Sequence, residues 1–174
     1  MRNFYLIILT ILSFNLYSQK ELIGDTILHT KINGSDAPDI MKLNNFSDYE
    51  FVRAGYDPDS ITNEIFVLRK DKKHLVIVTE VLRNDSTISN LVLDIIDVKL
   101  KSNQLIEFNF CWYDGKENPN IIAVMQETKT KYLYDKPVAG WEILKFKRRV
   151  EKVKLSKIEC SVDERHLKKE NKTN

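Results

Sequence analysis

Oxygen-bearing side chains are most concentrated in the pentapeptide YDPDS at residues 56–60. Carboxylates that alternate along a loop can bind Ca²⁺, so Asp57 and Asp59 are candidate metal ligands. The stretch lacks the Gly and the distal Glu of a calcium-binding loop, and Asp-Pro-Asp-Ser is also an ordinary turn sequence. A triad of Ser60, His29 and Asp57 lacks a nucleophile-elbow sequence, so we assign no catalytic residue. A small hydrolase or metal-dependent enzyme near Asp57, Asp59 and His29 stays an alternative.

The chain has two cysteines, Cys111 and Cys160. An even count in an exported chain favours a disulfide, although two separate thiols are equally compatible with a chain of this length. Neither cysteine belongs to a CxxC motif, and no His or Cys lies at metal-ligand spacing, so we expect neither thioredoxin-like chemistry nor a zinc site. We expect no cofactor. Cys111 shares its strand face with Glu107 and Asn109, so we do not expect it to lie in the core.

The stretch WYDGKENPN at residues 112–120 places two aromatic residues before a flexible polar segment. Loops of this composition occur in carbohydrate- and peptide-binding proteins, and loops carry function more often than cores do. A strand end with a core Trp and a Gly turn has the same composition. The candidate binding residues are Trp112, Tyr113, Asp114, Lys116 and Asn118.

Charge is distributed unevenly along the chain. Residues 19–144 contain 15 basic and 20 acidic residues, whereas residues 145–174 contain 11 basic and 5 acidic ones. Such a basic end can bind an anionic surface, such as envelope polysaccharide or lipid headgroups, or can be the solvated face of a hairpin. Phe146 is the only aromatic residue beyond Trp141, so the stacking series of a nucleic-acid-binding surface is missing. We expect no nucleic-acid partner.

The N-terminus has the three-part layout of a secretory signal peptide: a basic Met1-Arg2-Asn3, an apolar core at residues 4–16, and a polar exit. We expect residues 1–18 to be the signal peptide, with cleavage near Ser18 and export to the periplasm or the extracellular space. An uncleaved N-terminal anchor is the alternative. No later run approaches membrane-spanning length, so the mature chain should have no transmembrane segment. Residues 19–164 suit a single domain, and the polar tail 165–174 should be disordered.

Apolar, β-branched runs separated by short polar turns dominate the body of the chain, which predicts antiparallel sheet. Residues 102–103 should form a tight hairpin turn, and residues 105–112 should form one continuous alternating strand. The predicted strands cover residues 26–32, 65–69, 74–82, 89–101, 105–112 and 121–126.

The two ends of this body are less regular. Residues 36–38 can cap a short helix over residues 39–43, and residues 46–59 should be irregular. Near the C-terminus, residues 140–146 and 150–158 should form a hairpin around a turn at residues 147–149, because their β-branched content favours strands.

The stretch GWEILKFKRRVEKVKLSKIECSVDE, at residues 140–164, resembles the C-terminal hairpin of small exported bacterial envelope proteins of unknown function. These proteins often end with an aromatic strand, a basic turn, a second strand and a Cys. The resemblance extends to the Ser18-Gln19 exit of the predicted signal peptide. The resemblance implies a hairpin and export, and it supplies no catalytic residue.

The expected fold is mainly β: an antiparallel meander of seven or eight strands, as a sandwich or a partly open barrel, with room for one short N-terminal helix. The leading functional hypothesis is an exported, non-enzymatic binding module that recognises an envelope protein or a glycan. A small secreted enzyme and a binder of anionic surfaces through the basic hairpin are the alternatives.

Overall fold

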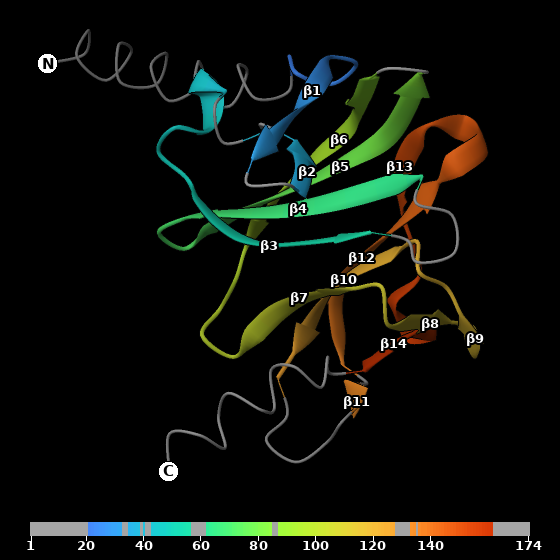
Figure 1. Cartoon of the computed structure of the whole chain (residues 1–174). Helices are drawn as coiled ribbons and strands as arrows, with labels where there is room; N and C mark the ends of the chain where they lie inside the picture. Colours follow the sequence, from blue (N-terminus) through green and yellow to red (C-terminus); the bar gives the residue numbers. More distant parts are fainter. Residues whose placement is uncertain are drawn as a thin grey trace, which may run out of the picture. The chain divides into compact units, whose positions relative to one another are not determined.

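The computed structural model describes residues 21–32, 35–38, 40, 43–56, 62–84, 87–127, 133–134 and 136–161 of the chain. These residues build three antiparallel sheets, none of which closes into a barrel (Figure 1). The described residues divide into two compact units: unit 1 holds those up to Ala54 and Thr62–Val98, and unit 2 holds Gly55, Tyr56 and those from Lys99 onward. The predicted mainly β, antiparallel fold class is confirmed.

None of the described residues belongs to a helix that is long and apolar enough to cross a membrane. The predicted signal peptide (1–18) and tail (165–174) lie outside the described residues, as do both ends of the predicted domain, residues 19 and 164.

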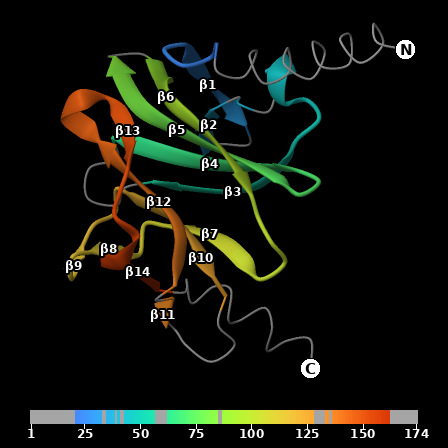
Figure 2. The same ribbon diagram turned by 180° about the vertical axis from the view of Figure 1, so that it is seen from behind.

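Unit 1 is built on a six-stranded sheet with the order β2-β1-β6-β5-β4-β3 (Figures 1 and 2). Strands β3 to β6 form the predicted meander, since each pairs with its neighbour in sequence. The hairpin of β1 and β2 adds to the remaining edge of β6, with Ile27 opposite Asn90. The strands are β1 Thr26–Ile32, β2 Ser35–Pro38, β3 Glu50–Tyr56, β4 Asn63–Lys70, β5 Lys73–Asn84 and β6 Thr87–Lys99.

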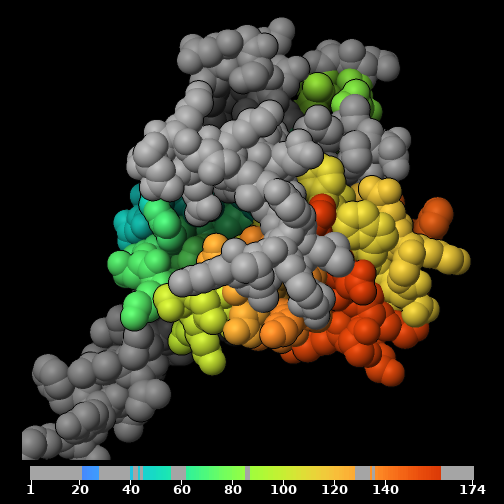
Figure 3. Space-filling view, turned by 90° about the horizontal axis from the view of Figure 1, so that it is seen from below, coloured from blue at the N-terminus to red at the C-terminus, as the bar shows by residue number. Residues whose placement is uncertain are grey.

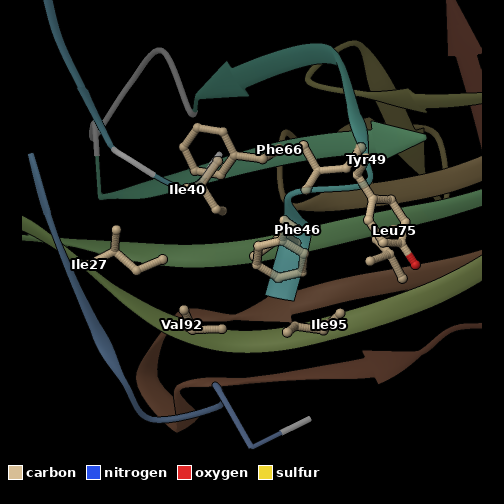
Figure 4. Close-up of a cluster of buried hydrophobic side chains, with 10 residues drawn as sticks. Ile27, Ile40, Phe46, Tyr49, Phe66, Leu75, Val92 and Ile95 are labelled. Carbon is tan, nitrogen blue, oxygen red and sulfur yellow. The ribbon is translucent and has the colours of Figure 1, made fainter. Parts of the chain in front are cut away.

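One face of this sheet carries the core of unit 1. Alternation along β4 and β5 places Phe66 opposite Ile77 and Leu68 opposite Leu75, so all four side chains share a face. The segment between β2 and β3, which includes the 3-10 turn Asn44–Phe46, adds Ile40, Phe46 and Tyr49 to a buried cluster on that face (Figure 4). The cluster consists of Ile27, Ile40, Phe46, Tyr49, Phe66, Leu68, Leu75, Ile77, Val92 and Ile95.

Two predictions for the N-terminal part of unit 1 were wrong. Ser35–Pro38 pairs with β1 as strand β2 and is not a helix cap. Of the predicted helix over residues 39–43, Ile40 lies in a 3-10 turn, Leu43 lies in a bend, and residues 39, 41 and 42 lie outside the described residues. The Asn33-Gly34 dipeptide between β1 and β2 is a favoured hairpin turn sequence, and Pro38 is tolerated because β2 is an edge strand. Residues 50–56 are not irregular either, since they form β3.

Unit 2 contains two four-stranded sheets, with the orders β13-β12-β10-β7 and β11-β14-β8-β9. Buried side chains of β10 and of the second sheet form one cluster, so the two sheets of this unit pack on each other. The cluster consists of Cys111, Ile121, Ala123, Met125, Tyr134, Ile158 and Cys160. The strands are β7 Gln104–Phe108, β8 Cys111–Tyr113, β9 Lys116–Glu117, β10 Ile121–Gln126, β11 Leu133–Tyr134, β12 Pro137–Leu144, β13 Arg149–Lys152 and β14 Ile158–Ser161.

The predicted strand over residues 105–112 is divided between the two sheets of unit 2. Asn109 has a φ of 75°, and this left-handed conformation ends β7 before β8 begins at Cys111. The break cancels the predicted alternation: Cys111 is fully buried, whereas Phe110 is exposed. The prediction that Cys111 lies outside the core was therefore wrong.

The predicted hairpin at residues 102–103 is also absent. The chain does turn there, with Gln104 N–H donating to Lys101 O at 3.0 Å. However, β6 and β7 belong to different sheets, because both edges of β6 are already occupied by β1 and β5.

The C-terminal hairpin is confirmed in β12 and β13, which pair with Leu144 opposite Arg149. Its second strand is shorter than predicted, since it ends at Lys152 and the 3-10 turn Leu155–Lys157 leads into β14 in the other sheet. Gly140 allows this return, because a Cβ atom there would overlap Ile158 Cδ1 and lie 3.3 Å from Val153 Cγ2. Breaks of this kind, and strands as short as β9, raise the strand number above the predicted seven or eight.

Candidate functional site

The predicted binding stretch forms a β-hairpin, not an irregular loop. Strand β8 pairs with β9, with Tyr113 opposite Lys116. The two turn residues, Asp114 and Gly115, have φ values of 56° and 72°. Positive φ at both central residues matches the type I′ turn, which Asp-Gly favours because its twist suits the flanking strands. The Asp-Gly dipeptide is the sequence signal for this hairpin.

An ion pair fixes the tip of this hairpin to the 3-10 turn that precedes β14. Lys157 Nζ donates to Asp114 Oδ2 at 2.8 Å, and Asp114 N–H donates to Lys157 O at 2.9 Å. Lys157 Nζ also lies 5.8 Å from the ring centroid of Tyr113, within cation–π distance. The hydrogen bond from Lys157 lowers the pKa of Asp114, and the same bond raises the pKa of Lys157.

Asn118 closes the base of the hairpin through three hydrogen bonds. Its N–H donates to Cys111 O at 2.8 Å, and its Nδ2 donates to Glu142 Oε1 of β12 at 2.9 Å. Its Oδ1 accepts from the Asn120 N–H at 3.0 Å. These bonds give Asn118 a structural role between the two sheets of unit 2.

The structure thus brings the predicted binding residues together on one hairpin and beside it. Figure 3 shows the yellow segment around β8 and β9 next to the red segment around β14. Trp112 and Tyr113 are half-buried, whereas Asp114 and Lys116 are exposed. The internal contacts of Asp114 and Asn118 account for these two residues without a ligand. A binding role for the five residues stays a prediction.

Cys111 and Cys160 form a disulfide at the base of the same hairpin. They are directly opposite each other in the β8–β14 pair, with their Cα atoms 4.0 Å apart. Both residues are fully buried in the unit 2 cluster. The disulfide alternative is therefore confirmed, and its burial indicates a structural bond.

The described residues place no side chains together that support the enzyme hypothesis. The candidate metal ligands Asp57 and Asp59 lie outside the described residues, and His29 is described only as a backbone position in β1, opposite Pro38. Within the part of the chain that the structure describes, no three His, Cys, Asp or Glu side chains form a group that could hold a metal ion.

A polar cluster inside unit 1 was not predicted. Asn90 Nδ2 donates to Glu64 Oε2 and to Thr79 Oγ1, both at 2.7 Å, and the Thr79 hydroxyl lies 3.2 Å from Glu64 O. Asn90 and Thr79 are fully buried. Their sequence signal is a polar residue on the buried face of an apolar strand. Because the buried atoms bond to one another, the cluster links β4, β5 and β6 and needs no ligand.

The apex of the β12–β13 hairpin, residues 145–149, is the second candidate surface, and we call it the basic apex. Strand β12 ends at Leu144, and the 3-10 turn Lys145–Lys147 follows. Arg148 then adopts a left-handed conformation, with a φ of 48°, and its N–H donates to Lys145 O at 3.2 Å. Arg148 thus supplies the positive φ that a Gly usually provides, which explains how this turn forms without one.

The basic apex exposes an aromatic side chain completely. Phe146 has a relative exposure of 106%, whereas the other exposed large apolar residues of the described chain lie between 36% and 47%. Its neighbours in sequence are Lys145, Lys147, Arg148 and Arg149. In Figures 1 and 2 the orange turn projects beyond the end of β12 and β13.

Two acidic side chains of this hairpin have partners. Glu142 and Glu151 are directly opposite each other in the β12–β13 pair, but each has a partner of its own. Glu151 forms an ion pair with Arg149, and Glu142 accepts a hydrogen bond from Asn118. Both carboxylates lie on the strands, and Glu151 pairs with one of the basic side chains of the apex, Arg149.

No protein-family model, curated protein sequence or solved structure matches this chain. The two surfaces of unit 2 are consequently the basis for a functional proposal.

Proposed function

We propose that this protein is an exported, non-enzymatic binding module that binds anionic surfaces through the basic apex. The observation that carries the proposal is the fully exposed Phe146 between basic residues on both sides. Because this ring is completely exposed, it contributes nothing to the core, and the side chains beside it in sequence are basic.

Export is supported by two independent features. The N-terminal 18 residues have the layout of a signal peptide. The Cys111–Cys160 disulfide is the kind of bond that persists in oxidising compartments outside the cytosol.

Electrostatic binding is supported by the composition of residues 145–157, which hold seven basic residues and one acidic residue. A basic residue near an anionic membrane surface contributes about 1 kcal/mol to binding, and salt screens this attraction. The β8–β9 hairpin is the weaker candidate surface, because Asp114 and Asn118 are occupied by internal contacts.

Two double variants test the proposal in the chain from Gln19 to Asn174, the expected mature form. Lys147→Gln/Arg148→Asn removes two charges from the apex, and Asn suits the positive φ at position 148. Lys101→Gln/Lys116→Gln removes two exposed charges elsewhere in unit 2 and is the matched control. The probes are immobilised heparin and vesicles that contain phosphatidylglycerol.

The wild type should bind at least one of the two anionic probes, with an affinity that falls as salt rises. The apex variant should bind on the order of 30-fold more weakly, as expected for two charges worth about 1 kcal/mol each. The control variant should lose much less. Equal losses in the two variants, or no binding by the wild type at low salt, would overturn the proposal.

A further inference from the structure

We infer that the anionic surface is a lipid bilayer and that Phe146 is the residue that enters it. This inference rests on the proposed function and adds the chemical class of the ligand. Its basis is the juxtaposition, in one protruding turn, of a completely exposed phenyl ring and basic side chains.

The shape of the apex suits a bilayer. None of the three residues in the 3-10 turn Lys145–Lys147 is buried, and Phe146 is the central one. The bond from Arg148 N–H to Lys145 O closes the turn, and the phenyl ring is completely exposed on it. A completely exposed ring encloses no small ligand, but it can enter the boundary between headgroups and acyl chains.

The charges of the apex fit the same placement. When the phenyl ring enters the acyl boundary, Lys147 can keep its charged end at headgroup level, because a long basic side chain extends its apolar stem along the membrane. The charge of Arg149 is already paired with Glu151 on β13. An aromatic anchor with an adjacent basic cluster is typical of interfacial membrane binding.

Other polyanions would use the apex differently. A polysaccharide or a nucleic acid offers phosphate, sulfate or carboxylate groups, but it has no apolar interior that would bury an entire phenyl ring. A stacking platform for nucleic acid needs a series of aromatic residues, and residues 142–174 contain Phe146 as their only one. Phe146 would therefore add little to binding of a polyanion, but much to binding of a bilayer.

The decisive variant is Phe146→Ser. Burial of a phenylalanine side chain contributes enough free energy for a change of roughly 10- to 100-fold in affinity. Because Phe146 packs against nothing in the fold, the variant should unfold at the same temperature as the wild type. Val138→Thr, at the other end of β12, is the control for loss of an exposed apolar group at nearly constant shape.

Binding is measured by vesicle flotation and on immobilised heparin, in the chain from Gln19 to Asn174. The inference predicts that Phe146→Ser binds phosphatidylglycerol vesicles at least about 10-fold more weakly, whereas its heparin binding changes less than about 2-fold. Val138→Thr should match the wild type on both probes. A Phe146→Trp variant should show a blue shift of its added fluorescence on vesicles and none with soluble heparin.

The outcomes separate the two proposals. If Phe146→Ser has wild-type affinity for vesicles while the apex charge variant binds them more weakly, lipid insertion is overturned and the proposed function stands. Equal losses of Phe146→Ser on vesicles and heparin would likewise exclude insertion and indicate contact with the polyanion itself. A wild-type chain that binds neither probe, but binds a protein through Phe146, would overturn both.

Discussion

At the scale of single residues, unusual backbone positions explain much of unit 2. Asn109 ends β7 and redirects the chain, Arg148 closes the basic apex, and Asp114 begins a hairpin turn, each with a positive φ. Asn and Asp are tolerated in this conformation, because their short polar side chains can hydrogen-bond locally, whereas Arg has no such advantage. Arg148 therefore carries a local backbone cost in the turn that presents Phe146.

His74, at the start of β5, should make stability depend on pH. Burial, together with the charge of Arg69 opposite it, lowers the pKa of His74 from its ordinary value of 6.5. The folded state thus disfavours the protonated ring, so the contribution of His74 to stability is fully present above pH 6.5 and is lost as the pH falls below that value.

Urea unfolding of wild type and His74→Gln at about pH 7.5 and about pH 5.5 checks this, because the two states then differ in proton binding. The variant should lose less stability between the two conditions than the wild type. His29 and His166 remain in both proteins, so the difference isolates position 74. An identical loss in the two proteins would contradict the assignment.

At the scale of elements, the sequence predicted strands better than it predicted their partners. The meander of β3 to β6 follows from alternation and turn residues, and β10 has the predicted bounds of residues 121–126. Residues 105–112 and 150–158 read as continuous strands, but each divides between two sheets. Such a division depends on which edges are free in the folded chain, and local alternation contains no information about this.

For the candidate site, too, the sequence indicated the residues but not their contacts. Composition identified Trp112, Tyr113 and the basic hairpin, since aromatic and charged residues in turns are visible in sequence. It could not show that Asp114 and Asn118 are held by Lys157 and Glu142, because these contacts join residues 43 and 24 positions apart. Nor could it show that Phe146 lies fully outside the core, since Ile143 in the same run is buried.

The β8–β9 hairpin should depend on its turn conformation more than on its ion pair. Gly115→Ala places a Cβ atom at a φ of 72°, and because nothing lies within 4 Å of that atom, the cost is purely conformational. We expect a loss of about 1 kcal/mol in the free energy of unfolding.

Asp114→Asn is the matched variant, since Asn keeps the tolerance for positive φ but removes the ion pair with Lys157. This exposed pair should contribute less than the turn does, because solvent screens it. Urea unfolding of both variants gives the comparison. A larger loss in Asp114→Asn would show that the ion pair, and not the turn, holds the hairpin.

At the scale of the whole molecule, the disulfide is the main covalent constraint. It joins residues that are 49 positions apart in unit 2, and the loop-entropy model assigns such a bond about 4 kcal/mol. Cys111→Ala/Cys160→Ala should therefore lower the free energy of unfolding by roughly 2–5 kcal/mol.

Calorimetry or urea unfolding of this double variant measures the loss. Reductant added to the folded wild type should change little, because both sulfur-bearing residues are completely buried. The same reductant in denaturant should produce the stability of the double variant. A double variant as stable as the wild type would show that the bond constrains nothing that the packing does not already fix.

The distribution of charge along the chain is also a property of the whole molecule. Residues 19–144 are acidic overall and residues 145–174 are basic, so the excess of basic residues is concentrated at the C-terminal end of the chain, which belongs to unit 2. A basic apex in a chain whose remainder is acidic should restrict which part of the molecule meets an anionic surface, since only the apex is attracted.

The most direct measurement of the central claim is residue-resolved NMR of the isotope-labelled chain from Gln19 to Asn174, with phosphatidylglycerol nanodiscs that carry a paramagnetic lipid. We predict that the strongest loss of amide signal falls on residues 144–149, and that added salt reverses it because the attraction is screened. The β8–β9 hairpin, including Trp112 and Lys116, should lose less. Strongest losses on that hairpin, or no losses at low salt, would contradict the account.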